Sequence, residues 1–231
     1  MMKVLITGST GAIGEATARY FYENGYFVYL HYHSNREKAE TLAQELGENT
    51  QIIGFDIACK TSVRAALAGI EVDVLVNNAG KTRDKMLFWM EDEDWDDVIQ
   101  TNLTGTYTVT KALLPSMQKK KFGAIINVAS VAGVVGNPGQ VNYAASKGGM
   151  IAMSKSLALE TARHNIRVNC VVPGFIHSEM TAGFNEKDFE RLIPMKRFGK
   201  PHEVAEVIFF LADKASYITA EVIIISGGMV R

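Results

Sequence analysis

Residues 4–14 read VLITGSTGAIG, an apolar run followed at once by a glycine-rich stretch. The apolar run predicts a buried strand, and residues 12–24 continue as a helix that ends at Gly25. Glycines at such a junction let the backbone turn tightly and approach a pyrophosphate, whose charge faces the helix N-terminal amides. A plain tight turn is the alternative, but the place of the loop in the first strand–helix unit favours a dinucleotide site. The candidate contacts are Gly8, Ser9, Thr10, Gly11, Ile13 and Gly14.

The same alternation of strand and helix patterns continues along the chain. Further strands are predicted at residues 27–32, 51–55, 72–76, 124–128, 168–172 and 222–225, and further helices at 36–46, 93–117 and 142–163. Near-continuous apolar strands are typical of a parallel sheet that is buried on both faces. We therefore predict an α/β fold, a single Rossmann-like domain over residues 1–231 with a doubly wound parallel sheet and helices on both faces. Residues 175–200 lack clear regular elements, which predicts a lid or binding loop.

The bulk composition excludes several classes of protein. The chain has 231 residues, 47% of them hydrophobic and 21% charged, as in ordinary globular domains. Its 24 basic and 25 acidic residues balance, so nothing favours a nucleic acid or a membrane surface as partner. Cys59 and Cys170 form no CxxC pair, which disfavours a metal site and favours a reduced, cytoplasmic protein. The sequence shows no signal-peptide pattern and no run of about 18 apolar residues.

Two more predicted strand ends carry residues suited to a cofactor. The turn NNAG at residues 77–80 follows a predicted strand, and such ends face the ligand crevice of open α/β sheets. A plain turn is the alternative there. Asp56 ends another predicted strand and could contact an adenine edge or merely cap a turn. The candidate contacts at these two places are Asp56, Ile57, Asn78, Ala79 and Gly80.

The residues after the predicted strand at 27–32 bear on the choice of cofactor. A site for NAD usually places an acid near this point, on the ribose hydroxyls, but no acid occurs here before Glu37. Ser34, Asn35 and Arg36 could instead bind a 2′-phosphate, although Arg36 could equally be a solvated residue at a helix start. We therefore predict NADP(H) as the preferred cofactor, with NAD(H) still possible.

Tyr143 and Lys147 stand four residues apart near the start of a predicted helix, and so on one face of it. A tyrosine with a pKa near 10 is a poor base at neutral pH. A lysine ammonium one turn away would lower that pKa. Ser130 follows the predicted strand at 124–128 and could hydrogen-bond a substrate oxygen. Asn102 interrupts the predicted helix at 93–117 and could hold a water that links Lys147 to solvent. A lone Tyr–Lys pair on a helix more often lies on the surface than in an active site. The four residues indicate a catalytic site only in combination.

Together these motifs resemble the short-chain dehydrogenase/reductase family over essentially the whole chain. The resemblance implies that residues 175–200 form the substrate loop. It implies a catalytic tetrad of Asn102, Ser130, Tyr143 and Lys147, the last two also on the cofactor, with Pro173, Gly174 and Ile176 along the nicotinamide. The chain departs from the family pattern at Ala12, where glycine is usual, and at Gly11, where a basic residue is common. The first departure predicts a modest shift of loop geometry, and the second removes one usual 2′-phosphate contact.

Within the family, five segments are most similar to the bacterial 3-oxoacyl-(acyl-carrier-protein) reductases. They are DKML at 84–87, WDDVI at 95–99, GNPGQ at 136–140, PGFI at 173–176 and SGGM at 226–229. The similarity implies a homotetramer that uses NADPH to reduce a 3-oxoacyl thioester of acyl-carrier protein or coenzyme A, in fatty-acid or related biosynthesis. Basic residues beside the active-site mouth would receive the acidic carrier, and the matching positions hold Lys121 and His164, with Arg163 adjacent. An ordinary solvated surface is an equally good explanation of these three.

Other functions stay open. The same machinery with a different loop could act on another carbonyl or alcohol, such as a sugar or a secondary metabolite, because the fold does not determine the substrate. A nucleotide-binding sensor that has lost catalysis is a second alternative. The intact Ser130, Tyr143 and Lys147 disfavour it, since a sensor needs none of them.

Overall fold

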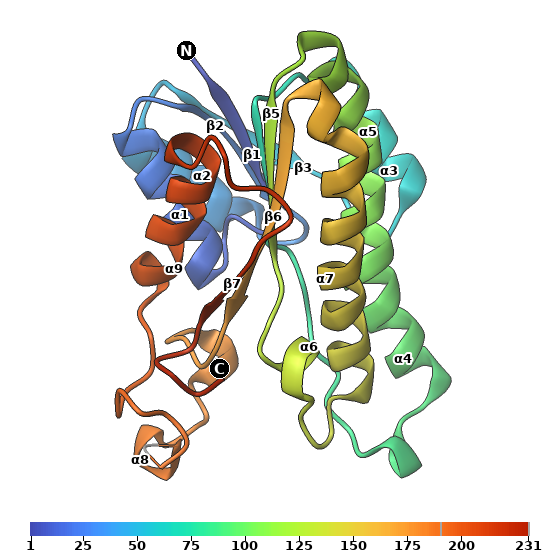
Figure 1. The fold of residues 1–231 in the computed structure, drawn as a ribbon, viewed down its shortest axis with the longest axis vertical. Coiled ribbons are helices and arrows are strands. Elements are labelled where there is room, and N and C mark those ends of the chain that lie inside the picture. The colour runs from blue at the N-terminus through green and yellow to red at the C-terminus, as the bar shows by residue number, and fades with distance from the viewer. Residues whose placement is uncertain (190, 231) are drawn as a thin grey trace.

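The computed structural model describes residues 1–189 and 191–230; residues 190 and 231, within the predicted loop and the predicted domain, lie outside the described residues. Its strands form one parallel sheet in the order β3-β2-β1-β4-β5-β6-β7 (Figure 1). They are β1 (Lys3–Ile6), β2 (Phe27–Tyr32), β3 (Thr50–Gly54), β4 (Val74–Asn77), β5 (Gly123–Val128), β6 (Ile166–Pro173) and β7 (Val222–Ile225). The predicted parallel sheet is confirmed, with each predicted strand shifted by at most two residues at either end.

Both faces of the sheet are covered, which explains the near-continuous apolar strands. Val4 and Ile6 pack into one core and Leu5 into the other, because successive side chains of a strand point to opposite faces. The helices α1 (Ala12–Glu23), α2 (Arg36–Leu46) and α9 (Pro201–Phe209) cover the first face. The helices α3 (Lys60–Ala66), α5 (Gly105–Lys120) and α7 (Val141–Thr161) cover the second, with α4 (Asp92–Ile99) leading into α5.

The predicted helix at 93–117 is not continuous. It consists of α4 and α5, joined by a π-helical turn at Gln100–Thr104. The sequence patterns also missed α3, α9 and the short helices α6 (Ala132–Val135) and α8 (Glu186–Phe189). In α9 most positions are apolar, because the helix packs closely on α1 and Phe209 lies 5.1 Å from the ring of Phe21. The helical period is nevertheless present in its buried residues, which are Val204, Ala205, Ile208 and Phe209.

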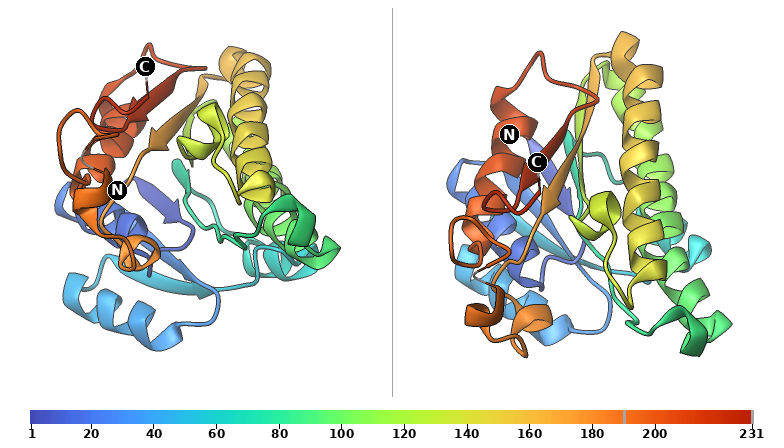
Figure 2. Two further views of the ribbon diagram at one scale, coloured as in Figure 1. Left: turned by 90° about the horizontal axis from the view of Figure 1, so that it is seen from below. Right: turned by 60° about the horizontal axis from the view of Figure 1, so that its bottom comes forward.

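The carboxyl ends of the strands share one edge of the sheet, which faces the viewer in Figure 2 (left). The chain order reverses between β1 and β4, and ligands of open α/β sheets bind at such a switch point. The first glycine loop and the turn at 77–80 both lie there, because they follow β1 and β4. Among the described helices, none combines the length and the apolar character needed to span a membrane. The cytoplasmic location stays a prediction.

Candidate active site

The two predicted cofactor segments meet at the switch point. The Thr7 hydroxyl accepts hydrogen bonds from the backbone N–H groups of Asn78 (2.9 Å) and Ala79 (3.0 Å). In return, the Asn78 side-chain amide donates to the carbonyls of Thr7 (3.0 Å) and Gly8 (3.1 Å). The turn after β4 therefore braces the glycine loop after β1, and the two segments form one rigid rim.

The glycines of this rim permit contacts that no side chain could. Gly8 has a φ of +65°, and a Cβ there would lie 2.9 Å from Ala79 Cα. A Cβ on Gly14 would lie only 2.2 Å from the carbonyl oxygen of Gly8. Helix α1 then begins at Ala12 with no side-chain cap on Gly11, so its first-turn amides face the rim unshielded. Such a glycine cradle at a helix N-terminus fits the pyrophosphate of a nicotinamide dinucleotide.

A buried histidine that the sequence reasoning did not single out supports the same loop. The N–H of Gly8 donates to Nδ1 of His31 (2.9 Å), so the proton of His31 is assigned to Nε2, which donates to the carbonyl of Phe55 (3.0 Å). Burial lowers the pKa of His31 to about 4, which keeps the ring neutral and Nδ1 an acceptor. Ser9 is engaged beside it, because its hydroxyl donates to the His31 carbonyl (3.0 Å). The sequence signal was a histidine at the end of a buried strand.

The residues predicted for the 2′-phosphate are largely engaged in α2 itself. Asn35 is the N-cap of α2, and its side-chain oxygen accepts from the backbone N–H of Lys38 (3.1 Å). Arg36 Nε lies 2.8 Å from Glu40 on the same helix. Ser34 lies in the exposed turn before the helix. Contact of Ser34, Asn35 and Arg36 with a 2′-phosphate stays a prediction.

Asp56, just past the end of β3, is placed both to cap a turn and to contact a ligand. Its side-chain oxygen accepts from the N–H of Ala58 (2.9 Å), which is the turn-capping role. The Asp56 side chain is still 43% exposed, so it remains accessible to a ligand. Ile57 is buried against α5, and a Cβ on Gly105 would lie 2.8 Å from it. Ile57 therefore sets the distance between this strand end and α5.

The four predicted catalytic residues come together at the same edge of the sheet. Lys147 is buried, its Nζ donates to the carbonyl of Val128 (2.7 Å), and it lies 5.7 Å from the ring centroid of Tyr143. Ser130 follows β5 and hydrogen-bonds Tyr143. A Cβ on Gly80 would lie 3.2 Å from Asn102 Oδ1 and 3.4 Å from Lys147 Nζ. The glycine that ends the cofactor rim thus also lies between two members of the catalytic set.

The expected lowering of the Tyr143 pKa is wrong in this structure. Burial raises the pKa of the Tyr143 phenol, and the hydrogen bond with Ser130 only opposes that shift. The Lys147 ammonium is directed at the Val128 carbonyl, and burial of the phenol dominates the shift. Burial also lowers the pKa of Lys147 to about 8. At pH 7 the pair is therefore a neutral phenol beside a mostly protonated lysine.

Asn102 has a supporting role that its sequence position did not reveal. It sits in the π-helical turn, a feature that often marks functional sites. Its side-chain amide accepts from the N–H of Lys81 (2.9 Å) and donates to the carbonyl of Lys81 (3.0 Å) and to the Ser146 hydroxyl (3.1 Å). Ser146 donates onward to the Tyr143 carbonyl (2.8 Å). Asn102 therefore fixes α7 beneath Tyr143.

Asn142, directly before Tyr143, is a second residue that sequence reasoning missed. It is fully buried, and its side-chain nitrogen donates to the carbonyls of Arg83 (3.1 Å) and Asp94 (3.0 Å). Its side-chain oxygen accepts from the backbone N–H of Tyr143 (2.7 Å). The first turn of α7 is thereby fixed to α4 and to the segment before it. The available signal was a lone asparagine in the first turn of the helix.

The segment Pro173–Ile176 leads from the end of β6 into the substrate loop. The carbonyl of Pro173 accepts from the N–H of Val131 (3.0 Å), and the N–H of Gly174 donates to Ile225 (2.9 Å). Ile176 forms a parallel bridge with Gly199. These contacts fix the segment between the Ser130 turn and β7.

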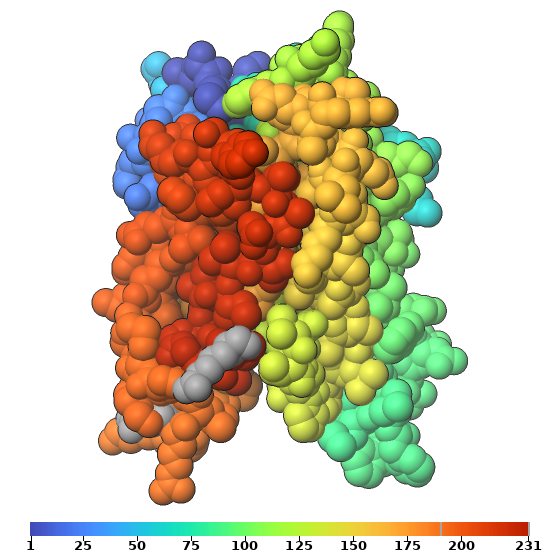
Figure 3. All heavy atoms as spheres, in the orientation of Figure 1, coloured from blue at the N-terminus to red at the C-terminus, as the bar shows by residue number. Residues whose placement is uncertain are grey.

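The described part of the predicted substrate loop, 175–189 and 191–200, folds on an aromatic cluster. Phe175 lies 4.5 Å from Phe189 and 5.4 Å from Phe198, and Phe184 lies 5.4 Å from Phe189, between ring centroids. Figure 3 shows a notch at the lower edge of the molecule, between this loop (orange) and α6 (yellow-green). The interior of the loop is accordingly apolar.

Within this chain, the predicted carrier-docking residues do not lie beside the active site. Lys121 directly follows α5, and Arg163 and His164 follow α7, so all three precede their next strand. They do gather, since Asn165 donates to the Lys121 carbonyl (3.3 Å). Tyr143, however, lies at the other end of α7, whose 21 residues span about 30 Å. Within one chain, these cations lie at the opposite edge of the sheet from the active site.

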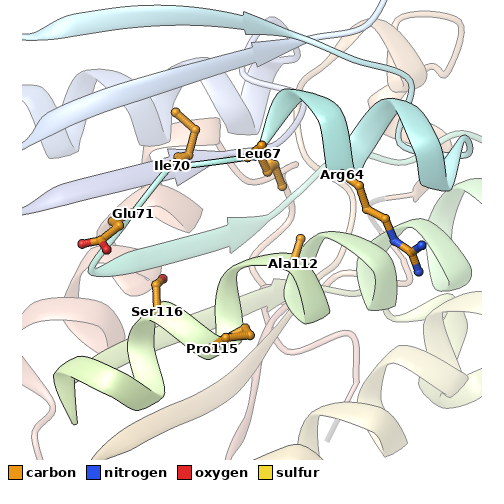
Figure 4. A pocket seen from close by; sticks show the side chains of 9 residues that line it. Arg64, Leu67, Ile70, Glu71, Ala112, Pro115 and Ser116 are labelled. Carbon is orange, nitrogen blue, oxygen red and sulfur yellow. The ribbon is translucent and has the colours of Figure 1, made fainter.

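A cavity of about 350 Å³ lies apart from all of these residues, between the end of α3 and α5 (Figure 4). Leu67, Ile70, Ala112 and Pro115 line it, with Arg64 and Glu71 at its rim. It contains none of the predicted site residues. Ser116 also lines the cavity, but its hydroxyl donates to the Leu113 carbonyl (2.8 Å) within α5 and not to a base.

This fold and this arrangement of residues define a family. The chain belongs to the short-chain dehydrogenases/reductases, since the family model for short chain dehydrogenases matches residues 2–188. It is therefore an NAD(P)-dependent oxidoreductase.

Several curated proteins are similar over nearly their full length. Nodulation protein G of Rhizobium meliloti (strain 1021) is 48% identical over 98% of this chain and 96% of its own length. The 3-oxoacyl-[acyl-carrier-protein] reductase of Thermotoga maritima is 45% identical over 98% of this chain and 96% of its own. The protein of that name from Staphylococcus aureus (strain N315) is 43% identical over 97% and 96%.

Proposed function

We propose that this protein reduces a 3-oxoacyl thioester, carried by acyl-carrier protein or coenzyme A, to the 3-hydroxyacyl form with NADPH, in fatty-acid or related acyl-chain biosynthesis. The observation that carries the proposal is the meeting of Ser130, Tyr143 and Lys147 beside a glycine cradle. Two relatives named as 3-oxoacyl-[acyl-carrier-protein] reductases, 45% and 43% identical over nearly the whole chain, support the substrate. The aromatic cluster of the substrate loop suits an acyl chain.

The proposed roles follow from charge and burial. Bound NADPH supplies the hydride. Ser130 and Tyr143 hydrogen-bond the keto oxygen, and the neutral Tyr143 phenol donates its proton to that oxygen as negative charge develops there. Lys147, still protonated below its pKa of about 8, stabilises the tyrosinate that remains. Asn102 holds α7 in place for both residues, and a water relay through Asn102 stays a prediction.

The homotetramer and the docking surface are proposed together. Lys121 and Arg163 lie at the far edge of the sheet from their own site, so they can meet a bound carrier only at the site of another copy. The edge strand β7 is only partly covered, and Leu159 on α7 is 77% exposed, which leaves apolar surface for self-association. A stable monomer in sedimentation at micromolar concentration would contradict both claims.

The test of the function is the loss of absorbance at 340 nm on adding an acetoacetyl thioester, with NADPH and with NADH. We expect rapid turnover with NADPH, a higher kcat/KM for the carrier-protein thioester than for the coenzyme A thioester, and a lower rate with NADH. A kcat/KM ratio of NADPH over NADH below one overturns the cofactor assignment. NADPH binding without turnover on either thioester overturns the substrate assignment, and turnover on a panel of sugars or other carbonyls would then identify the alternative reductase. Binding with no turnover on any carbonyl would favour the sensor.

A further inference from the structure

The first turn of α2 carries two cations, Arg36 and Lys38, just past the end of β2. The adenosine ribose of a dinucleotide lies past this strand end in α/β folds of this kind. Residues two positions apart on an α-helix point about 200° apart, so only one of the two can face the crevice. The contacts of the two side chains show which one it is.

Arg36 lies on the outer surface of α2. Its Nε is 2.8 Å from Oε1 of Glu40, one turn further along the same helix, and its side chain is 68% exposed. The ion pair runs along the helix and already neutralises the guanidinium. Nothing in this arrangement directs Arg36 toward the glycine loop.

Lys38 reaches across the crevice instead. Its Nζ lies 3.5 Å from Oε1 of Glu179, which begins the short turn Glu179–Thr181 in the substrate loop. Its side chain is only 39% exposed, and the next residue, Ala39, is fully buried. The backbone N–H of Lys38 donates to the Asn35 cap, which fixes its place in the first turn. Lys38 therefore lies on the crevice side of α2, between the end of β2 and the substrate loop.

Resting on the proposed use of NADPH, we propose that Lys38 selects NADPH over NADH by pairing with the 2′-phosphate. Glu179 is the carboxylate that the phosphate displaces from Lys38, since a phosphate monoester carries close to two negative charges at pH 7 and a carboxylate carries one. The glycine loop brings no cation of its own to this place, because Gly11 occupies the position in front of α1. The positive end of α2 adds to the attraction, since Lys38 lies in its first turn.

The experiment measures binding without any substrate, by calorimetric titration of 2′,5′-ADP and of 5′-AMP. Lys38→Met is expected to weaken 2′,5′-ADP at least about tenfold, which is the worth of one charged hydrogen bond, while 5′-AMP changes less than about twofold. Arg36→Met is expected to change neither ligand by more than about twofold, as for an exposed pair. Lys119→Met, at the far edge of the sheet, is the control for loss of one positive charge. Glu179→Gln is expected to tighten 2′,5′-ADP, because it removes the competing carboxylate.

The outcomes separate this inference from the proposed function. Equal weakening of both ligands by Lys38→Met means a structural role and overturns the inference, as does a larger effect from Arg36→Met. If the wild type prefers 2′,5′-ADP and Lys38→Met keeps that preference, the role of Lys38 fails while NADPH use stands. If the wild type binds both ligands equally, NADPH use fails and the role of Lys38 fails with it. Absence of thioester reduction alters none of these titrations.

Discussion

Replacing Tyr143 with phenylalanine is expected to lower kcat for carbonyl reduction by roughly 10²-fold or more, because it removes the only atom proposed to donate a proton to the substrate oxygen. The ring keeps its packing, and the cofactor rim at Gly8 and Gly14 is untouched, so NADPH binding should change little. The same reason predicts an unchanged melting temperature. The measurement is steady-state turnover at 340 nm, together with a titration of NADPH.

The chain contains its own control for this substitution. Tyr107 and Lys111 have the same four-residue spacing on α5, and Lys111 Nζ donates to the Tyr107 hydroxyl (2.9 Å). That hydrogen bond lowers the pKa of Tyr107, the shift that the sequence pattern predicted for Tyr143. Tyr107 is nevertheless exposed and belongs neither to the glycine cradle nor to the proposed catalytic group, so Tyr107→Phe should leave kcat unchanged. Near-normal turnover in the Tyr143 variant would remove Tyr143 from the mechanism.

The comparison of these two pairs shows what sequence spacing can and cannot predict. Spacing predicted that Tyr143 and Lys147 share a helix face, and the structure confirms it. It did not predict where the ammonium is directed, because the carbonyl of Val128 comes from another element. The roles of the buried asparagines were missed for the same reason, since their partners also come from other elements. Asn142 bonds to residues 48 and 59 positions away, which no local pattern reveals.

Strand direction explains which errors were avoidable. The strands were predicted well because burial on both faces makes them apolar throughout. In a parallel sheet, residues before a strand and residues after it lie at opposite edges. Lys121 precedes β5 and Ser130 follows it, so the distance between the docking residues and the site could have been predicted from the sequence. The π-helical turn could not be predicted from the sequence, because its contacts with Lys81 exist only in the folded chain.

Gly14→Ala is expected to weaken NADPH binding by about 10²-fold or more, because the rim must deform to accept one methyl group. A Cβ at this position would lie 2.2 Å from the Gly8 carbonyl oxygen and 2.8 Å from the Asn78 side chain. Both atoms are held, since Asn78 bonds the carbonyls of Thr7 and Gly8. The strain should also lower the free energy of unfolding by roughly 1–3 kcal/mol.

Gly11→Ala is the matched comparison, because its added Cβ would meet the Gly8 oxygen at an ordinary 3.5 Å with φ at −84°. Titration of NADPH and thermal unfolding of both variants should therefore separate a steric requirement from a general intolerance of the loop. Alanine is the better helix former by about 1 kcal/mol, so at Gly14, inside α1, local propensity alone would stabilise the variant. A destabilised Gly14 variant beside a normal Gly11 variant would then reflect the close contacts with Gly8 and Asn78. Equal affinity for NADPH in the two variants would mean that the rim accommodates the added methyl group. It would contradict the steric requirement for glycine at position 14.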